Sequence, residues 1–236
     1  TMGIGVKRFI SSRLSHEIYL GCGVAAAISA GFNAPIAGVV FAHEAILRHF
    51  SVRAVAPITV ASVSASALGN LWFPQTTTFE ISTLLPPLAE VVPVLLLLAP
   101  VFALVAICFM WALRSSAQTA VRTNTSPIVL TFVAATICGL VGVWIPQILG
   151  LGISSINDMI AGEFSLSLLL TVLIAKLLLS AMCIGFGLFG GVFSPSLFIG
   201  VAAGALAGQL LVLFGFADIA SIISVAGMAA VSSAVI

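Results

Sequence analysis

The chain has 236 residues, of which 61% are hydrophobic and 6% are charged, and its mean hydropathy is +1.29. A soluble domain has about 45–50% apolar and about 25% charged residues, so the composition excludes that class and indicates an integral membrane protein. The net charge of +1 points to no particular partner, and we expect the lipid bilayer and no nucleic acid.

Long apolar stretches recur along the chain. They lie at about 17–34, 54–73, 91–113, 128–149, 164–184, 196–216 and 219–236. A membrane β-barrel would show short alternating strands, so these stretches predict helices. We therefore predict an all-α, multi-pass membrane protein whose bundle contains tilted and broken helices.

The charged residues are segregated along the chain. Basic residues form three groups, namely Lys7, Arg8 and Arg13; Arg48 and Arg53; and Arg114 and Arg122. Acidic residues in the intervening connections are Glu80, Glu90, Asp158, Glu163 and Asp218. Because cytoplasmic loops carry an excess of Lys and Arg, the basic groups are predicted inside and the acidic connections outside.

This assignment requires residues 17–47 to leave one side of the membrane and return to it. The stretch is interrupted at Gly31-Phe-Asn-Ala-Pro35, so we expect two short helices that meet in a turn. Asn33 is the predicted N-cap of the second helix, and Pro35 is expected near its first position. Ser194-Pro195 repeats the pattern of a polar residue followed by proline, and also predicts a short helix that begins within the membrane.

Two connections carry polar or turn-forming residues. Residues 74–90 predict an external connection, and residues 150–163 predict a second one with a short interfacial helix. Neither carries a catalytic grouping, and the chain has no HExxH, GxSxG or GxxxxGK[ST] motif, so we expect no enzyme. The cysteines show no metal-ligand spacing, which predicts four small core residues and no metal site.

Residues 185–195, Gly-Phe-Gly-Leu-Phe-Gly-Gly-Val-Phe-Ser-Pro, place four glycines in seven positions before a proline. The glycines allow the chain to leave the helical path, and Pro195 fits the first turn of a new helix. The amide N–H groups and the positive dipole end of that helix would face a low-dielectric space. This arrangement suits an anion.

Weak internal similarity links the two ends of the chain. Residues 23–32 and 227–236 agree at five of ten positions, as in transporters built from two related halves. We predict one transmembrane domain over 1–236, with a first-repeat part at about 1–114 and a second at about 126–236. The last apolar run has no capping signal, so we expect an internal fragment of a longer protein. Gly200, Gly204 and Gly208 predict close helix packing.

Three segments together resemble the CLC family of chloride channels and chloride/proton exchangers. They are Gly31–Glu44, the GxFxP-like Gly191-Val-Phe-Ser-Pro195, and Ala226–Ala234. The resemblance implies a pseudo-two-fold helical fold, a homodimer with one pore per subunit, and a plasma-membrane location. It implies chloride as the transported ligand, with no cofactor, held by the backbone N–H groups of Val192 and Phe193 beside Gly191.

The sequence also departs from the family pattern. The gating glutamate and the filter serine of the family would lie before Thr1, and its filter tyrosine would lie after Ile236. Exchangers carry a second glutamate directly after the position of Glu44, where this chain has Ala45. This difference favours a channel, or an exchanger with another proton route.

Two charged residues fall within apolar segments and have several interpretations. Glu44 is expected either in a structural ion pair, near the cytoplasmic mouth, or on a proton path. Lys176 would pair with Glu44, reach an interface, or add positive potential to the anion path. Two other functions remain alternatives at this stage, namely a membrane scaffold or sensor without transport and a cation-coupled transporter of an organic anion.

Overall fold

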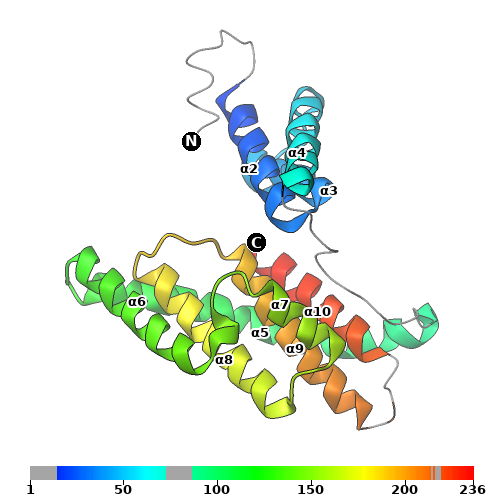
Figure 1. Ribbon diagram of the computed structural model, residues 1–236, viewed down its shortest axis with the longest axis vertical. Coiled ribbons are helices and arrows are strands. Elements are labelled where there is room, and N and C mark those ends of the chain that lie inside the picture. The colour runs from blue at the N-terminus through cyan, green and yellow to red at the C-terminus, as the bar shows by residue number, and fades with distance from the viewer. Residues whose placement is uncertain (1–14, 73–86, 214, 216–218) are drawn as a thin grey trace. The chain divides into compact units, whose positions relative to one another are not determined.

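A computed structural model describes residues 15–72, 87–213, 215 and 219–236. The chain divides into two compact units, residues 1–78 and 79–236, and each is described by itself (Figure 1). The predictions made for Lys7, Arg8, Arg13, Glu80, Asp218 and residues 74–86 lie outside the described residues. The expected division into two repeats and the single domain stay predictions.

The described residues form helices and no strands, which confirms the predicted all-α class. The first unit contains α2 (His16–Phe32), α3 (Pro35–Phe41), the π-helix η1 (Ala42–Leu47) and α4 (Val52–Trp72). The second contains α5 (Leu88–Arg122), α6 (Pro127–Trp144), the 3-10 turn η2 (Pro146–Ile148), α7 (Ile153–Ala161), α8 (Leu166–Gly185), α9 (Phe193–Val212) and α10 (Ala220–Val235). Each predicted apolar stretch contains one main helix.

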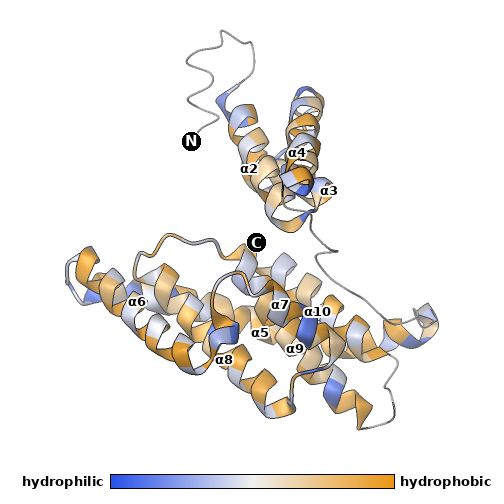
Figure 2. Cartoon of the chain, viewed as in Figure 1, coloured by the Kyte–Doolittle hydropathy of each residue, from blue (hydrophilic) through white to orange (hydrophobic). Residues whose placement is uncertain are grey.

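Five helices are long and apolar enough to cross a membrane. They are Val52–Trp72, Ala89–Arg122, Pro127–Trp144, Leu166–Gly185 and Phe193–Val212. In four of them 11–22% of the most apolar window is buried, whereas in α9 the share is 61%. Apolar residues occur along most of the length of α5, α6 and α8 (Figure 2). The chain is therefore a multi-pass membrane protein in which α9 forms the centre of its unit.

The first unit confirms the interruption near Gly31 but corrects its cap. Asn33 has a left-handed backbone (φ 49°) and ends α2, while Ala34 is the N-cap of α3 and Pro35 its first residue. Asparagine tolerates this conformation. Its side-chain Oδ1 accepts hydrogen bonds from Ser66 Oγ and Asn70 Nδ2, both at 3.0 Å. The side chain therefore binds α4 instead of capping α3.

Buried hydroxyl groups also connect the helices of the first unit. Ser29 Oγ on α2 donates to the Ser62 carbonyl at 2.7 Å, and Ser62 Oγ on α4 donates to the Pro35 carbonyl at 2.8 Å. Both serines are fully buried. The two bonds link α2 and the first residue of α3 to α4, and they therefore hold the turn between α2 and α3 against α4.

In the second unit, α9 packs against α10, α8, α5 and α7. Gly200, Gly204 and Gly208 lie where α9 crosses α10. A Cβ at Gly200 would lie 2.5 Å from the Gly227 carbonyl oxygen, and one at Gly208 would lie 2.9 Å from that of Ala220. Such distances are below van der Waals contact, which confirms that the glycines permit close packing.

Two smaller expectations have different outcomes. The predicted short helix in residues 150–163 is α7, whose Ile156, Met159 and Ile160 are buried. The cysteine prediction was wrong, because Cys108 is exposed and the other three are only half-buried. Cys108 lies on the outward face of α5, where a membrane helix contacts lipid or a neighbouring segment instead of its own core.

Candidate functional site

The glycine-rich segment leaves the helical path after α8, as predicted. The amides of Phe186 and Leu188 donate back to the carbonyls of Met182 and Cys183, both at 2.9 Å, and Gly187 has φ 93°. A side chain at Gly185 would collide with Ser116 and Ala117 of α5. Glycine is therefore required where α8 ends for two reasons, namely close packing at Gly185 and a left-handed backbone at Gly187.

The helix that follows begins slightly earlier than expected and is not short. Val192 is the N-cap of α9, Phe193 its first residue, and the helix runs for 20 residues. The Ser196 amide donates to the Val192 carbonyl at 3.0 Å, and Ser196 Oγ donates to the Phe193 carbonyl at 2.7 Å. Pro195 lies in the first turn, as predicted, whereas Ser194 is not the cap. Proline needs only a position near the helix start, so it does not fix the cap residue.

Backbone donors accumulate just before α9. The amides of Gly190, Gly191 and Val192 donate no hydrogen bond to any residue that the structure describes. They lie next to the positive end of the α9 dipole. Amides at the start of a helix lack intrahelical partners, so Val192 and the two glycines before it leave three backbone donors without a partner among the described residues.

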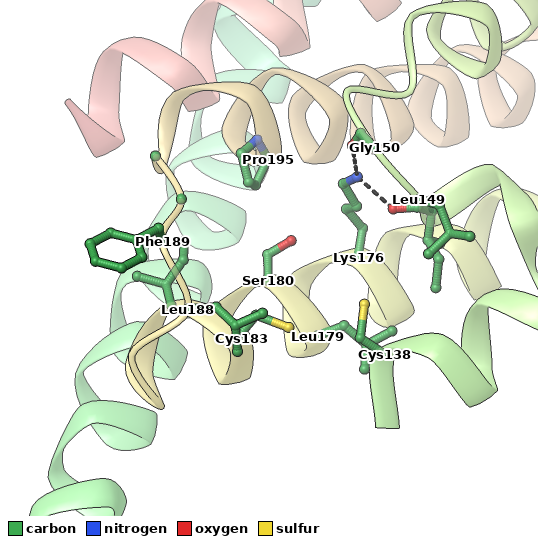
Figure 3. A pocket seen from close by; sticks show the side chains of 14 residues that line it. Cys138, Leu149, Gly150, Lys176, Leu179, Ser180, Cys183, Leu188, Phe189 and Pro195 are labelled. Atoms are coloured by element: carbon green, nitrogen blue, oxygen red, sulfur yellow. Dashed lines mark hydrogen bonds between the residues drawn. The ribbon is translucent and has the colours of Figure 1, made fainter. Parts of the chain in front are cut away.

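A pocket of about 310 Å³ lies beside this segment, within the second unit (Figure 3). It is lined by α8, by Cys138 of α6, by the glycine-rich segment, by Pro195 of α9 and by the turn around Ile148 and Gly150. Lys176 and Ser180 of α8 are among its lining residues. The pocket thus brings a basic side chain close to the predicted anion-binding segment.

Lys176 is buried, with 5% of its surface exposed. Its ammonium group donates to the carbonyls of Ile148 at 2.6 Å and Gly150 at 3.0 Å, and lies 4.9 Å from the centre of the Phe198 ring. These partners carry no net charge. The carboxylates of this unit that the structure describes, those of Glu90, Asp158 and Glu163, form no ion pair with it.

Glu44 belongs to the first unit, where it lies exposed in η1. Arg48 follows at the end of η1 with a left-handed backbone (φ 58°). The adjacent His43 is fully buried, donates from Nδ1 to the Val39 carbonyl at 2.9 Å and stacks on Phe50 at 4.9 Å. Because Glu44 and Lys176 lie in different units, their pairing stays a prediction.

The structure therefore gathers Gly191, Val192 and Lys176 in one unit, but not Glu44. Sequence reasoning missed Ser180, whose hydroxyl points into the pocket (Figure 3). Its spacing of four residues from Lys176 was the available signal, because residues at i and i+4 share a helix face. The role of Ile148 and Gly150 had no such signal, since their backbone carbonyls, not their side chains, contact Lys176.

Comparisons with known proteins place these features in a family. The family described as "Voltage gated chloride channel" matches residues 2–236. The H(+)/Cl(-) exchange transporter ClcA of Vibrio parahaemolyticus is 26% identical over 225 residues, covering 92% of this chain and 48% of the transporter. The chain thus spans about half the length of the curated relatives it matches.

Two solved structures share the fold. A slow cyanobacterial Cl-/H+ antiporter superposes with a TM-score of 0.81 at 20% identity, covering 96% of this chain and 55% of the antiporter. A CLC-type fluoride/proton antiporter gives a TM-score of 0.77 at 22% identity, covering 98% and 57%. The fold, the glycine-rich start of α9 and the family match over residues 2–236 agree, and the chain belongs to the CLC family of voltage-gated chloride channels.

Proposed function

We propose that the complete protein passes chloride, or a similar small anion, across a membrane as a channel or proton-coupled exchanger. The anion is held by the backbone amides of Val192 and Phe193, next to Gly191. The observation that carries this proposal is the start of α9, where a 20-residue helix opens from a glycine-rich segment whose Gly191 and Val192 amides have no partner among the described residues.

Backbone amides suit transport because they attract an anion without a full opposite charge. An ion held only by dipoles can replace its hydration shell and still leave, and throughput requires this balance. The dipole of a helix as long as α9 adds to the attraction at its N-terminus.

The proposal extends to the assembly and the coupled ion. We expect a homodimer in the lipid bilayer of the plasma membrane, with chloride as ligand and no cofactor. One relative is named an H(+)/Cl(-) exchanger and one structural neighbour a fluoride/proton antiporter. Because Ala45 follows Glu44, we favour a channel or an exchanger whose protons take another route.

Replacing Val192 by proline tests the amide site. Val192 has φ −75°, which proline adopts readily, so Val192→Pro removes one donor with little strain. Phe193→Pro is less suitable, because proline disfavours the helical backbone that Val192 adopts before it. A hydrogen bond to a charged group contributes about 1.5–3 kcal/mol, so we expect Val192→Pro to weaken chloride binding roughly tenfold or more.

The matched control is Val192→Ala, which keeps the donor and should bind chloride within about twofold of the wild type. Binding is measured by calorimetry on the full-length protein, and flux by chloride efflux from proteoliposomes. Equal affinity and flux in both variants would refute the amide site. If chloride does not change the melting temperature of the full-length protein, and the protein carries no chloride flux, the result would indicate a membrane scaffold.

A further inference from the structure

The charge of Lys176 has no acidic partner among the described residues of its own unit. The residue lies ten positions after the start of α8, which is 20 residues long and apolar enough to span the membrane. An ammonium group at that depth is unfavourable unless it is paired or hydrated. The carbonyls of Ile148 and Gly150 satisfy two of its three N–H donors but leave its net charge uncompensated.

Other donors face the same space as Lys176. The Ser180 hydroxyl points into the pocket and forms no hydrogen bond with any described residue (Figure 3). A serine in a helix commonly donates to the carbonyl four residues before it. Ser180 makes no such bond, so its hydroxyl is available to a ligand. Gly190 and Gly191 line the same pocket, and their amides are without partners among the described residues.

We infer that this pocket is an anion-binding site in its own right, in which a small inorganic anion neutralises Lys176. The third N–H of the ammonium group, the Ser180 hydroxyl and the Gly190 amide would supply its donors. The position of Lys176, about 15 Å along α8 from Leu166, is too deep for a lipid headgroup. The ligand class is therefore a dissolved monovalent anion such as chloride.

This site goes beyond the amide site at Val192 and Phe193 and does not depend on it. In the pocket the anion is bound by the ammonium charge of Lys176 and the hydroxyl of Ser180. In the amide site the anion is bound by backbone N–H groups at the start of α9. An anion held by a full opposite charge also exchanges more slowly than one held by dipoles alone. We therefore assign the pocket a resident anion that compensates the charge of Lys176 and is separate from the proposed amide site.

Bromide provides a direct test because it scatters X-rays anomalously and resembles chloride. Crystals of the full-length protein grown in bromide should show an anomalous peak in the pocket, against Lys176 and Ser180. Lys176→Met should lose this peak, and Lys176→Arg should retain it. In calorimetry of the same proteins, Lys176→Met should lose one class of bromide sites, while the affinity of the amide site stays within about twofold.

The outcomes separate the two sites. A wild-type peak at Val192 with none in the pocket overturns this inference and leaves the proposed function intact. A carboxylate from another segment, including Glu44, bound to Lys176 in place of bromide also overturns it. A pocket peak without one at Val192 supports the inference and counts against the amide site. If Lys176→Met does not fold, the presence or absence of an anomalous bromide peak in the pocket of the wild-type protein decides whether the inference holds.

Discussion

Gly204 provides the sharpest test of how α9 is positioned. A Cβ there would lie 2.6 Å from Ser224 Cα and 2.9 Å from the Ser224 carbonyl oxygen, and closer still to the Ile223 carbonyl. Ordinary contact begins at 3.4 Å, so Gly204→Ala forces the α10 backbone to retreat by about 0.8 Å at Ser224 Cα and by more at the Ile223 carbonyl. Backbone on both helices meets here, and neither can move aside as a flexible side chain can.

The magnitude follows from two opposing effects. Overpacking of this kind costs about 1–3 kcal/mol, and contact with backbone places the cost in the upper half of that range. Alanine gains about 1 kcal/mol over glycine inside a helix. The expected net loss in the free energy of unfolding is about 1–2 kcal/mol for Gly204→Ala.

Gly139 on α6 offers a matched control. A Cβ at Gly139 meets nothing within 4 Å, and the residue is exposed. Gly139→Ala should therefore stabilise the protein by about 0.5–1 kcal/mol, through helix propensity alone. Unfolding of the two full-length variants is followed in detergent by heating and by denaturant titration. Gly204→Ala as stable as Gly139→Ala would refute the close-packing argument.

Three further substitutions test the first unit and the centre of the second. Asn33→Ala should cost about 1–2 kcal/mol of unfolding free energy, because alanine disfavours φ 49° and the substitution removes two hydrogen bonds. Asn33→Gly should recover the part of this cost that comes from the backbone. Equal melting temperatures of the two variants would contradict this expectation. Ser62→Ala removes a buried donor to the Pro35 carbonyl and should cost about 1–2 kcal/mol in denaturant titration, against no change for the exposed Ser64→Ala. Gln209→Leu removes the bond from its side-chain amide to the Phe164 carbonyl and should lower the melting temperature of the full-length protein; an unchanged melting temperature would show that this bond is dispensable.

Local properties of the sequence determined the class of protein and the place of the glycine-rich segment before α9. A helix that faces lipid must be apolar on every side, so the long apolar stretches of the sequence alone located each long helix. The glycines at 185–191 and Pro195 have backbone preferences that act within a few residues. They therefore predicted, without knowledge of the fold, that α8 ends and α9 begins within this segment, but not which residue caps α9.

Tertiary structure decided which groups meet. Asn33 has the properties of an N-cap, yet its side chain binds Ser66 and Asn70 on α4, 33 and 37 residues away. Lys176 finds its partners in carbonyls 28 and 26 residues before it, and no side-chain pattern marks a backbone carbonyl. Periodicity and propensity act over a few neighbouring residues, whereas these contacts depend on how separate helices pack, which local sequence does not encode.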